Sequence, residues 1–203
     1  MRSTHKKEPK KIYQIFCEWE SEENYFLYLW KQLWKSIHCH KLQHKDFKWI
    51  IKEIRDAVNL KWLKKKEVFC IIDKDEHNIQ ECQDNNSRLL KYAELIFSSK
   101  SFEVWILMHP SKFEKEVQSV QEYKKILNSG SNKQFFTKNG FNWEIRKPYS
   151  DEKLLNILYN NTQKAIDNAE YVSNKQLEEN WNNKFKCEPY SDMWKLIKEI
   201  VFN

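Results

Sequence analysis

The run Glu67-Val68-Phe69-Cys70-Ile71-Ile72 limits the possible folds of this chain more than any other feature. After one charged residue it has five apolar residues in succession, with no alternation of apolar and polar positions. A strand that faces water on one side alternates, whereas a strand covered on both faces is apolar throughout. Fully covered strands are typical of parallel sheets with helices on both sides. We therefore expect a buried parallel strand at residues 67–72.

Three further short strands and four helices are expected to alternate with this strand. The strands are predicted at residues 12–17, 37–42 and 93–97. Ser21 precedes two glutamates, so it is expected to cap a helix whose apolar stripe runs from Tyr25 to Trp34. The other helices are predicted over residues 47–60 and 78–92, and from a Ser101 cap through Met108. Alternating strands and helices favour a parallel α/β sheet of four strands.

After Ser111 the pattern becomes helical. Helices are predicted over residues 112–127, 151–170, 173–184 and 191–201, and residues 128–150 are expected to form a loop. We expect these helices to pack on the sheet and to form no independent second domain. The predicted organisation is a flexible basic arm (1–10), an α/β core (11–110) and a helical C-terminal part of the same domain (111–203).

Composition excludes several functional classes. The chain has only two glycines, Gly130 and Gly140, so neither a GxGxxG fingerprint nor a Walker A loop can be present. The five cysteines form no CxxC pair, which argues against a zinc ribbon. No apolar segment approaches the roughly 18 residues of a membrane span, and no signal peptide is evident. We expect a reduced, cytoplasmic protein with no membrane partner.

The charge balance favours a polyanionic partner. The formal net charge is +6, and lysines and an arginine cluster in residues 2–11 and 61–66. Basic runs of this kind are typical of proteins that bind nucleic acid, DNA or RNA. A solvated tail and a solvated turn explain the same runs equally well.

Acidic residues follow two of the predicted strands. Glu18 comes directly after the first strand, and Asp73 and Asp75 follow the third. In a parallel sheet the carboxyl ends of the strands share one edge, so three carboxylates can meet there. Hard oxygen ligands suit Mg²⁺ or Mn²⁺, which can polarise a phosphoryl oxygen and activate a bound water. The alternative is that Asp73 and Asp75 are ordinary turn residues before a helix.

Three motifs in this order resemble the RloB-like branch of the Toprim proteins. That pattern has roughly a C-E-G-x-T-E-x-x-Y-F start, a D-x-D-x-H block and an F-E-x-W-x-L-x-H segment. Here residues 17–26 read CEWESEENYF, residues 73–77 read DKDEH and residues 102–109 read FEVWILMH. The segment YSDMWKL at 190–196 is also similar to the last segment of the family. The resemblance covers nearly the whole chain.

The resemblance implies a metal-dependent phosphodiester-cleaving nuclease. It also implies a role in anti-phage defence, beside an ATPase partner, because such proteins occur at defence and restriction loci. Trp19 stands where the family usually has Gly, which removes a tight turn and a close backbone approach to phosphate. It favours the alternative, a catalytically inactive module for nucleic-acid binding or assembly, although its ring can also stack on a base. A primase- or topoisomerase-like enzyme is disfavoured, because a topoisomerase needs a Tyr nucleophile in a second large domain and 203 residues leave little space for one.

Four more residues are candidates for the catalytic site. Glu22 is a candidate second carboxylate or further ligand, or simply a helix-start acid. Glu103 lies in an apolar segment, where a carboxylate is costly unless it is paired or bound to a metal. His77 can hold a metal-bound water or donate to phosphate, or be an ordinary helix-start residue. His109 ends a predicted helix, where the helix dipole alone favours His.

Overall fold

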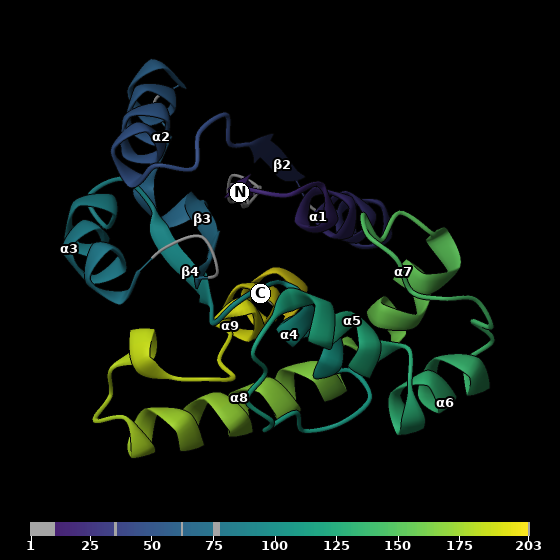
Figure 1. Ribbon diagram of the computed structural model, residues 1–203. Helices are drawn as coiled ribbons and strands as arrows, with labels where there is room; N and C mark the ends of the chain where they lie inside the picture. The colour runs from purple at the N-terminus through teal and green to yellow at the C-terminus, as the bar shows by residue number, and fades with distance from the viewer. Residues whose placement is uncertain (1–10, 35, 62, 75–77, 203) are drawn as a thin grey trace, which may run out of the picture.

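The computed structural model describes residues 11–34, 36–61, 63–74 and 78–202, and its centre is a four-stranded parallel sheet (Figure 1). The strand order is β2-β1-β3-β4. All three neighbouring pairs are parallel, with β1 in register against β2 and β3, and β3 against β4. The predicted α/β class and the four parallel strands are confirmed. The bounds are β1 Ile12–Cys17, β2 Ser36–Lys41, β3 Val68–Asp73 and β4 Glu94–Ser98.

Both faces of the sheet are covered, as the apolar run at 67–72 predicted. All six residues of β3 are buried. Phe69 and Ile71 belong to one apolar cluster, and Cys70 and Ile72 belong to a second cluster on the opposite face. Successive side chains of a strand point to opposite faces, so one strand supplies both clusters.

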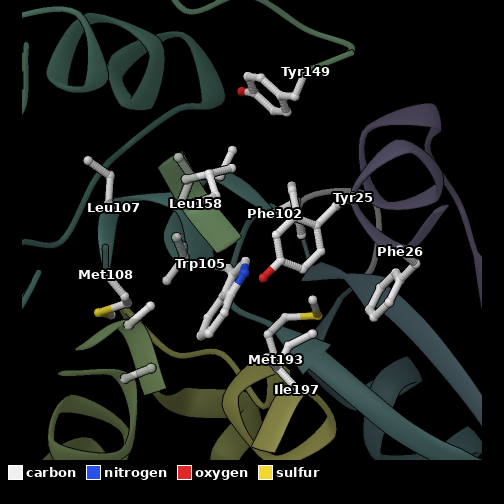
Figure 2. Close-up of a cluster of buried hydrophobic side chains, with 14 of the residues drawn as sticks. Tyr25, Phe26, Phe102, Trp105, Leu107, Met108, Tyr149, Leu158, Met193 and Ile197 are labelled. Atoms are coloured by element: carbon white, nitrogen blue, oxygen red, sulfur yellow. The ribbon is translucent and has the colours of Figure 1, made fainter. Parts of the chain in front are cut away.

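Helices α2 and α3 cover one face, and the remaining helices pack mainly on the other (Figure 1). Figure 2 shows the second set meeting in one core, where the ring of Tyr25 from α1 contacts those of Phe102 and Trp105, with centroids 5.6 and 6.4 Å away. Met193 and Ile197 of the last helix belong to this core. The bounds are α1 Glu20–Leu33, α2 Phe47–Lys61, α3 Ile79–Leu89, α4 Glu103–Leu107, α5 Val120–Leu127, α6 Gly130–Lys138, α7 Glu152–Asn160, α8 Thr162–Glu179 and α9 Met193–Phe202, with 3₁₀ turns η1 Lys65–Glu67 and η3 Lys184–Lys186.

Two predicted helix caps are wrong. Helix α1 begins at Glu20, so Trp19 is the N-cap residue, in extended conformation, and its side chain makes no cap hydrogen bond. Only two residues separate β1 from α1, which places Ser21 inside the first turn. Phe102, not Ser101, precedes α4. Neither α1 nor α4 has a side-chain hydrogen bond from its N-cap residue.

The predicted helical bounds after residue 111 also need correction. Residues 112–119 have no regular secondary structure, and α5 begins only after the N-cap Ser119, whose side chain accepts a hydrogen bond from the Glu122 amide at 3.3 Å. The predicted loop contains α6. Residues 151–184 divide at Asn161, which ends α7 and begins α8, rather than at residues 171–172. Among the described helices, none is long and apolar enough to cross a membrane. The predicted basic arm, residues 1–10, lies outside the described residues.

Candidate acidic site at the carboxyl edge of the sheet

Glu18 and Asp73 lie together at the carboxyl edge of adjacent strands. Glu18 directly follows β1, and Asp73 is the last residue of β3. The backbone amide of Asp73 donates a hydrogen bond of 3.1 Å to Oε2 of Glu18. Both side chains are buried. The parallel pairing of β1 with β3 therefore brings together two residues that are 55 positions apart in the sequence.

Glu22 and Glu103 add two buried carboxylates to this edge. Glu22 is in the first turn of α1 and Glu103 is the first residue of α4, and they are 1% and 0% exposed. Burial, with smaller contributions from the carboxylates of Glu103 and Glu18, raises the pKa of Glu22 to about 8 against the opposing effects of a backbone hydrogen bond and of Lys147. Oε2 of Glu22 and Oε2 of Glu103 have no hydrogen-bond partner among the described residues. Such buried polar atoms are uncommon in folded proteins.

Two residues of the segment before α7 complete the cluster. Lys147 Nζ forms an ion pair of 3.0 Å with Oε1 of Glu103, and the Tyr149 hydroxyl donates to the same oxygen at 2.5 Å. Burial acts to lower the pKa of Lys147, but Glu103, Asp73 and Glu22 outweigh it, so the pKa is raised. Lys147 therefore remains protonated and supplies positive charge to the carboxylates. Sequence reasoning missed both residues, since no spacing in the polar segment 128–150 indicates that it reaches the strand ends.

Trp19 lies at the rim of the acidic cluster. The Nζ of Lys45 lies 4.3 Å from the centroid of a Trp19 ring, and that of Lys147 lies 5.8 Å away. Both distances are within the range of cation–π attraction. The Trp19 side chain, in the usual glycine position, thus contacts both Lys147 of the acidic cluster and Lys45.

The family model for RloB-like proteins matches residues 13–200. This chain belongs to the RloB-like family. No curated protein and no solved structure matches it. The matched range begins in β1 and ends in α9, so it includes Glu18, Asp73, Glu103 and the segment that carries Lys147.

Three further site residues were predicted for this RloB-like protein: Asp75, His77 and His109. Asp75 and His77 lie outside the described residues. His109 is fully buried, with its ring 5.0 Å from that of Trp105 and its Nδ1 near the carbonyl oxygens of Trp105 and Ile106. Burial lowers the pKa of His109 to about 4, so the ring is neutral at pH 7. None of these contacts joins His109 to the acidic cluster, and its catalytic role stays a prediction.

The donor set has the chemistry that a hard divalent cation requires. It consists of carboxylate oxygens, and two of them are buried without hydrogen-bond partners in the described part of the chain. Within the same described ranges, no three His, Cys, Asp or Glu side chains are already arranged as a metal-holding group. The four carboxylates therefore fit a cation in charge and ligand type, while a full set of ligands requires side-chain movement or residues outside the described ranges.

Proposed function

We propose that this RloB-like protein is a metal-dependent nuclease that cleaves phosphodiester bonds at the acidic cluster. One observation carries the proposal: four carboxylates, from β3, α1, α4 and the connection after β1, are buried together, and two of them have an oxygen atom without a partner among the described residues. Buried like charges are unfavourable unless a cation compensates them. Lys147 supplies only one positive charge, so a divalent ion could compensate the remaining negative charge of the carboxylates.

The residues have distinct proposed roles. Glu18 and Asp73, with Asp75, are the proposed ligands of Mg²⁺ or Mn²⁺. When bound, the ion would supply Lewis-acid polarisation of phosphate and a more acidic water. Glu22 can hold or release a proton near neutral pH, because burial raises its pKa to about 8. The Lys147 ammonium is placed to neutralise a phosphate oxygen that approaches the cluster.

Aromatic rings and lysines in residues 44–52, the segment that includes the start of α2, support a nucleic-acid substrate. Trp49 of α2 is 43% exposed, and the His44 ring lies 5.5 Å from its own ring. Lys48 and Lys52 lie 5.8 and 5.0 Å from the Trp49 ring. Exposed aromatic rings flanked by cations are typical of surfaces that stack unpaired bases and contact phosphates. We propose that DNA or RNA reaches the cluster across this surface.

We propose a defence role beside an ATPase partner, and only the resemblance to RloB-like proteins supports it. With only two glycines the chain has no phosphate-binding loop, so hydrolysis of ATP would require a partner protein. Co-purification of an ATPase with the tagged chain supports this role, whereas robust cleavage by the isolated chain removes the need for a partner. The five cysteines are all free thiols in the structure, which is consistent with the cytoplasmic location that we propose.

The experiment is cleavage of single-stranded DNA, duplex DNA, total RNA and tRNA, with Mg²⁺, Mn²⁺ or EDTA. We expect metal-dependent cleavage that is lost in Asp73→Asn and Glu18→Gln. The matched control is Glu20→Gln, which removes an exposed carboxylate from the same end of α1. Unchanged cleavage by both site variants would end the catalytic-metal proposal.

The second candidate is an inactive nucleic-acid-binding or assembly module. Trp19 in the glycine position favours it, and so does the Lys147 ammonium, which already occupies one side of Glu103. A divalent ion that binds only the folded state stabilises it by an amount that rises with the logarithm of the ion concentration above its Kd. An inactive module therefore predicts no change of melting temperature with Mg²⁺ or Mn²⁺, whereas the nuclease predicts an increase that Asp73→Asn diminishes.

A further inference from the structure

A second candidate site lies at the opposite end of β3. It is a cavity of about 740 Å³, which we call the lysine pocket. Its walls come from the turn before β3, the end of α3, the start of β4 and the C-terminal part. Because β3 spans six residues, the pocket and the acidic cluster are separated by roughly 17 Å along the strand. The lining residues are Lys64, Lys65, Lys66, Asn86, Leu90, Glu94, Leu95, Lys184, Asp192 and Lys195.

The lining is strongly cationic. It has five lysines against two carboxylates, Glu94 and Asp192. Within the described chain, the ammonium groups of Lys64, Lys65 and Lys66 form no ion pair with a protein carboxylate. Like charges that share one cavity repel each other, and an anion bound among them relieves that repulsion.

Two of the lysines are held in place by Asp192. Its carboxylate receives Lys184 Nζ and Lys195 Nζ at 2.7 Å each, and the Tyr190 hydroxyl at 2.7 Å. Lys184 Nζ also donates to the Leu95 carbonyl oxygen at 3.3 Å. This network fixes one wall of the pocket. The negative charge of Asp192 is neutralised by Lys184 and Lys195. Lys64, Lys65 and Lys66 form no ion pair within the described residues, and Glu94 is the remaining carboxylate of the lining.

The pocket also has an apolar surface. Leu95 is 3% exposed, and Leu90, just after α3, is 38% exposed. A volume of about 740 Å³ is within the range of small-molecule sites, which commonly combine an apolar lining with a few charged groups. We propose that the lysine pocket binds a nucleoside phosphate, with its base on Leu90 and against the small exposed part of Leu95, and its phosphates on Lys64–Lys66. This site is separate from the acidic cluster and does not depend on the proposed nuclease activity.

The test is isothermal titration calorimetry, which measures the affinity of the full chain for ATP, AMP and inorganic tripolyphosphate. EDTA is present so that no divalent ion contributes. The pocket variant is Lys64→Ala/Lys65→Ala/Lys66→Ala, at three exposed positions. The control is Lys124→Ala/Lys125→Ala, which removes exposed lysines from α5. Glu103→Gln serves as a second control, because it alters only the acidic cluster.

We expect saturable binding of ATP with one site per chain, weakened at least tenfold in the pocket variant and unchanged in both controls. ATP should bind at least tenfold more tightly than tripolyphosphate, since only ATP contacts the leucines. Equal affinity for the two would overturn the nucleoside part of the proposal. Equal weakening in the pocket and α5 variants would show non-specific attraction and overturn the site, as would an absence of saturable binding.

Discussion

Replacement of Glu22 by Gln tests the electrostatics of the acidic cluster directly. Gln has the shape of a protonated Glu, so Glu22→Gln keeps the side chain neutral at every pH. In the wild-type protein, burial raises the pKa of Glu22 from 4.5 to about 8. The folded state therefore binds a proton that the unfolded state has already released between these pH values. A group whose folded pKa is raised contributes stability at low pH and loses it as the pH rises toward the folded pKa.

The magnitude follows from the two pKa values. Between pH 4.5 and about 8, each unit of pH lowers the wild-type free energy of unfolding by about 1.4 kcal/mol. Glu22 is 1% exposed, so solvent screens this effect little. The loss reaches roughly 3 kcal/mol at pH 7 and about 5 kcal/mol above pH 8. We therefore expect Glu22→Gln to be as stable as the wild type at pH 4.5 and more stable by these amounts at higher pH.

Urea denaturation in EDTA at several values between pH 5 and pH 9 measures this difference. The control is Glu20→Gln, in the same turn of α1 but exposed, and its stability should parallel that of the wild type. Addition of Mg²⁺ should raise wild-type stability most above pH 7, because ionised Glu22 favours the cation. Parallel pH profiles for the wild type and Glu22→Gln would refute the reasoning, since Glu22 would then titrate at its ordinary pKa.

Other side chains give equally specific expectations. Lys147→Met should lower the free energy of unfolding by about 3 kcal/mol, because it leaves the buried Glu103 carboxylate without its ion pair, and Glu103→Gln in the same chain should restore most of the loss. Trp49→Ala should weaken binding of single-stranded oligonucleotide by about 1–3 kcal/mol in fluorescence anisotropy, whereas Trp181→Ala, at a 94% exposed position remote in sequence, should not. Ser119→Ala should lower thermal stability by about 1 kcal/mol through loss of the cap on α5.

The sheet could be predicted from sequence because its strands carry a strong local signal. The all-apolar run ending at Ile72 and the run 12–17 each match an observed strand within a residue. Helix bounds after Ser111 were less predictable. Phe113 and Val117 have helical spacing and are buried in the core, but the segment that carries them has no regular secondary structure. Tertiary burial of a few apolar side chains can thus produce a periodic pattern without a helix.

The candidate site was predictable only in part, for a similar reason. Glu18 and Asp73 lie at strand ends, and the rule that parallel strands share a carboxyl edge is enough to place them together. Glu103 was indicated by the cost of a carboxylate within an apolar segment. Lys147 and Tyr149 were not, because their approach depends on how the segment between α6 and α7 folds back across the sheet, and no local pattern specifies that path.

Lys147 makes the C-terminal part a component of the acidic cluster, because this part supplies the lysine that pairs with Glu103. Helices α7, α8 and α9 share a core with α1, β1 and β3, and Tyr190 donates its backbone amide to Ser99 Oγ just beyond β4 at 2.7 Å. The segment before α7 then places one ammonium among four buried carboxylates. A strand edge alone would hold those carboxylates only with strong mutual repulsion. The C-terminal part therefore both completes the core and supplies the positive charge that allows the acidic cluster to be buried.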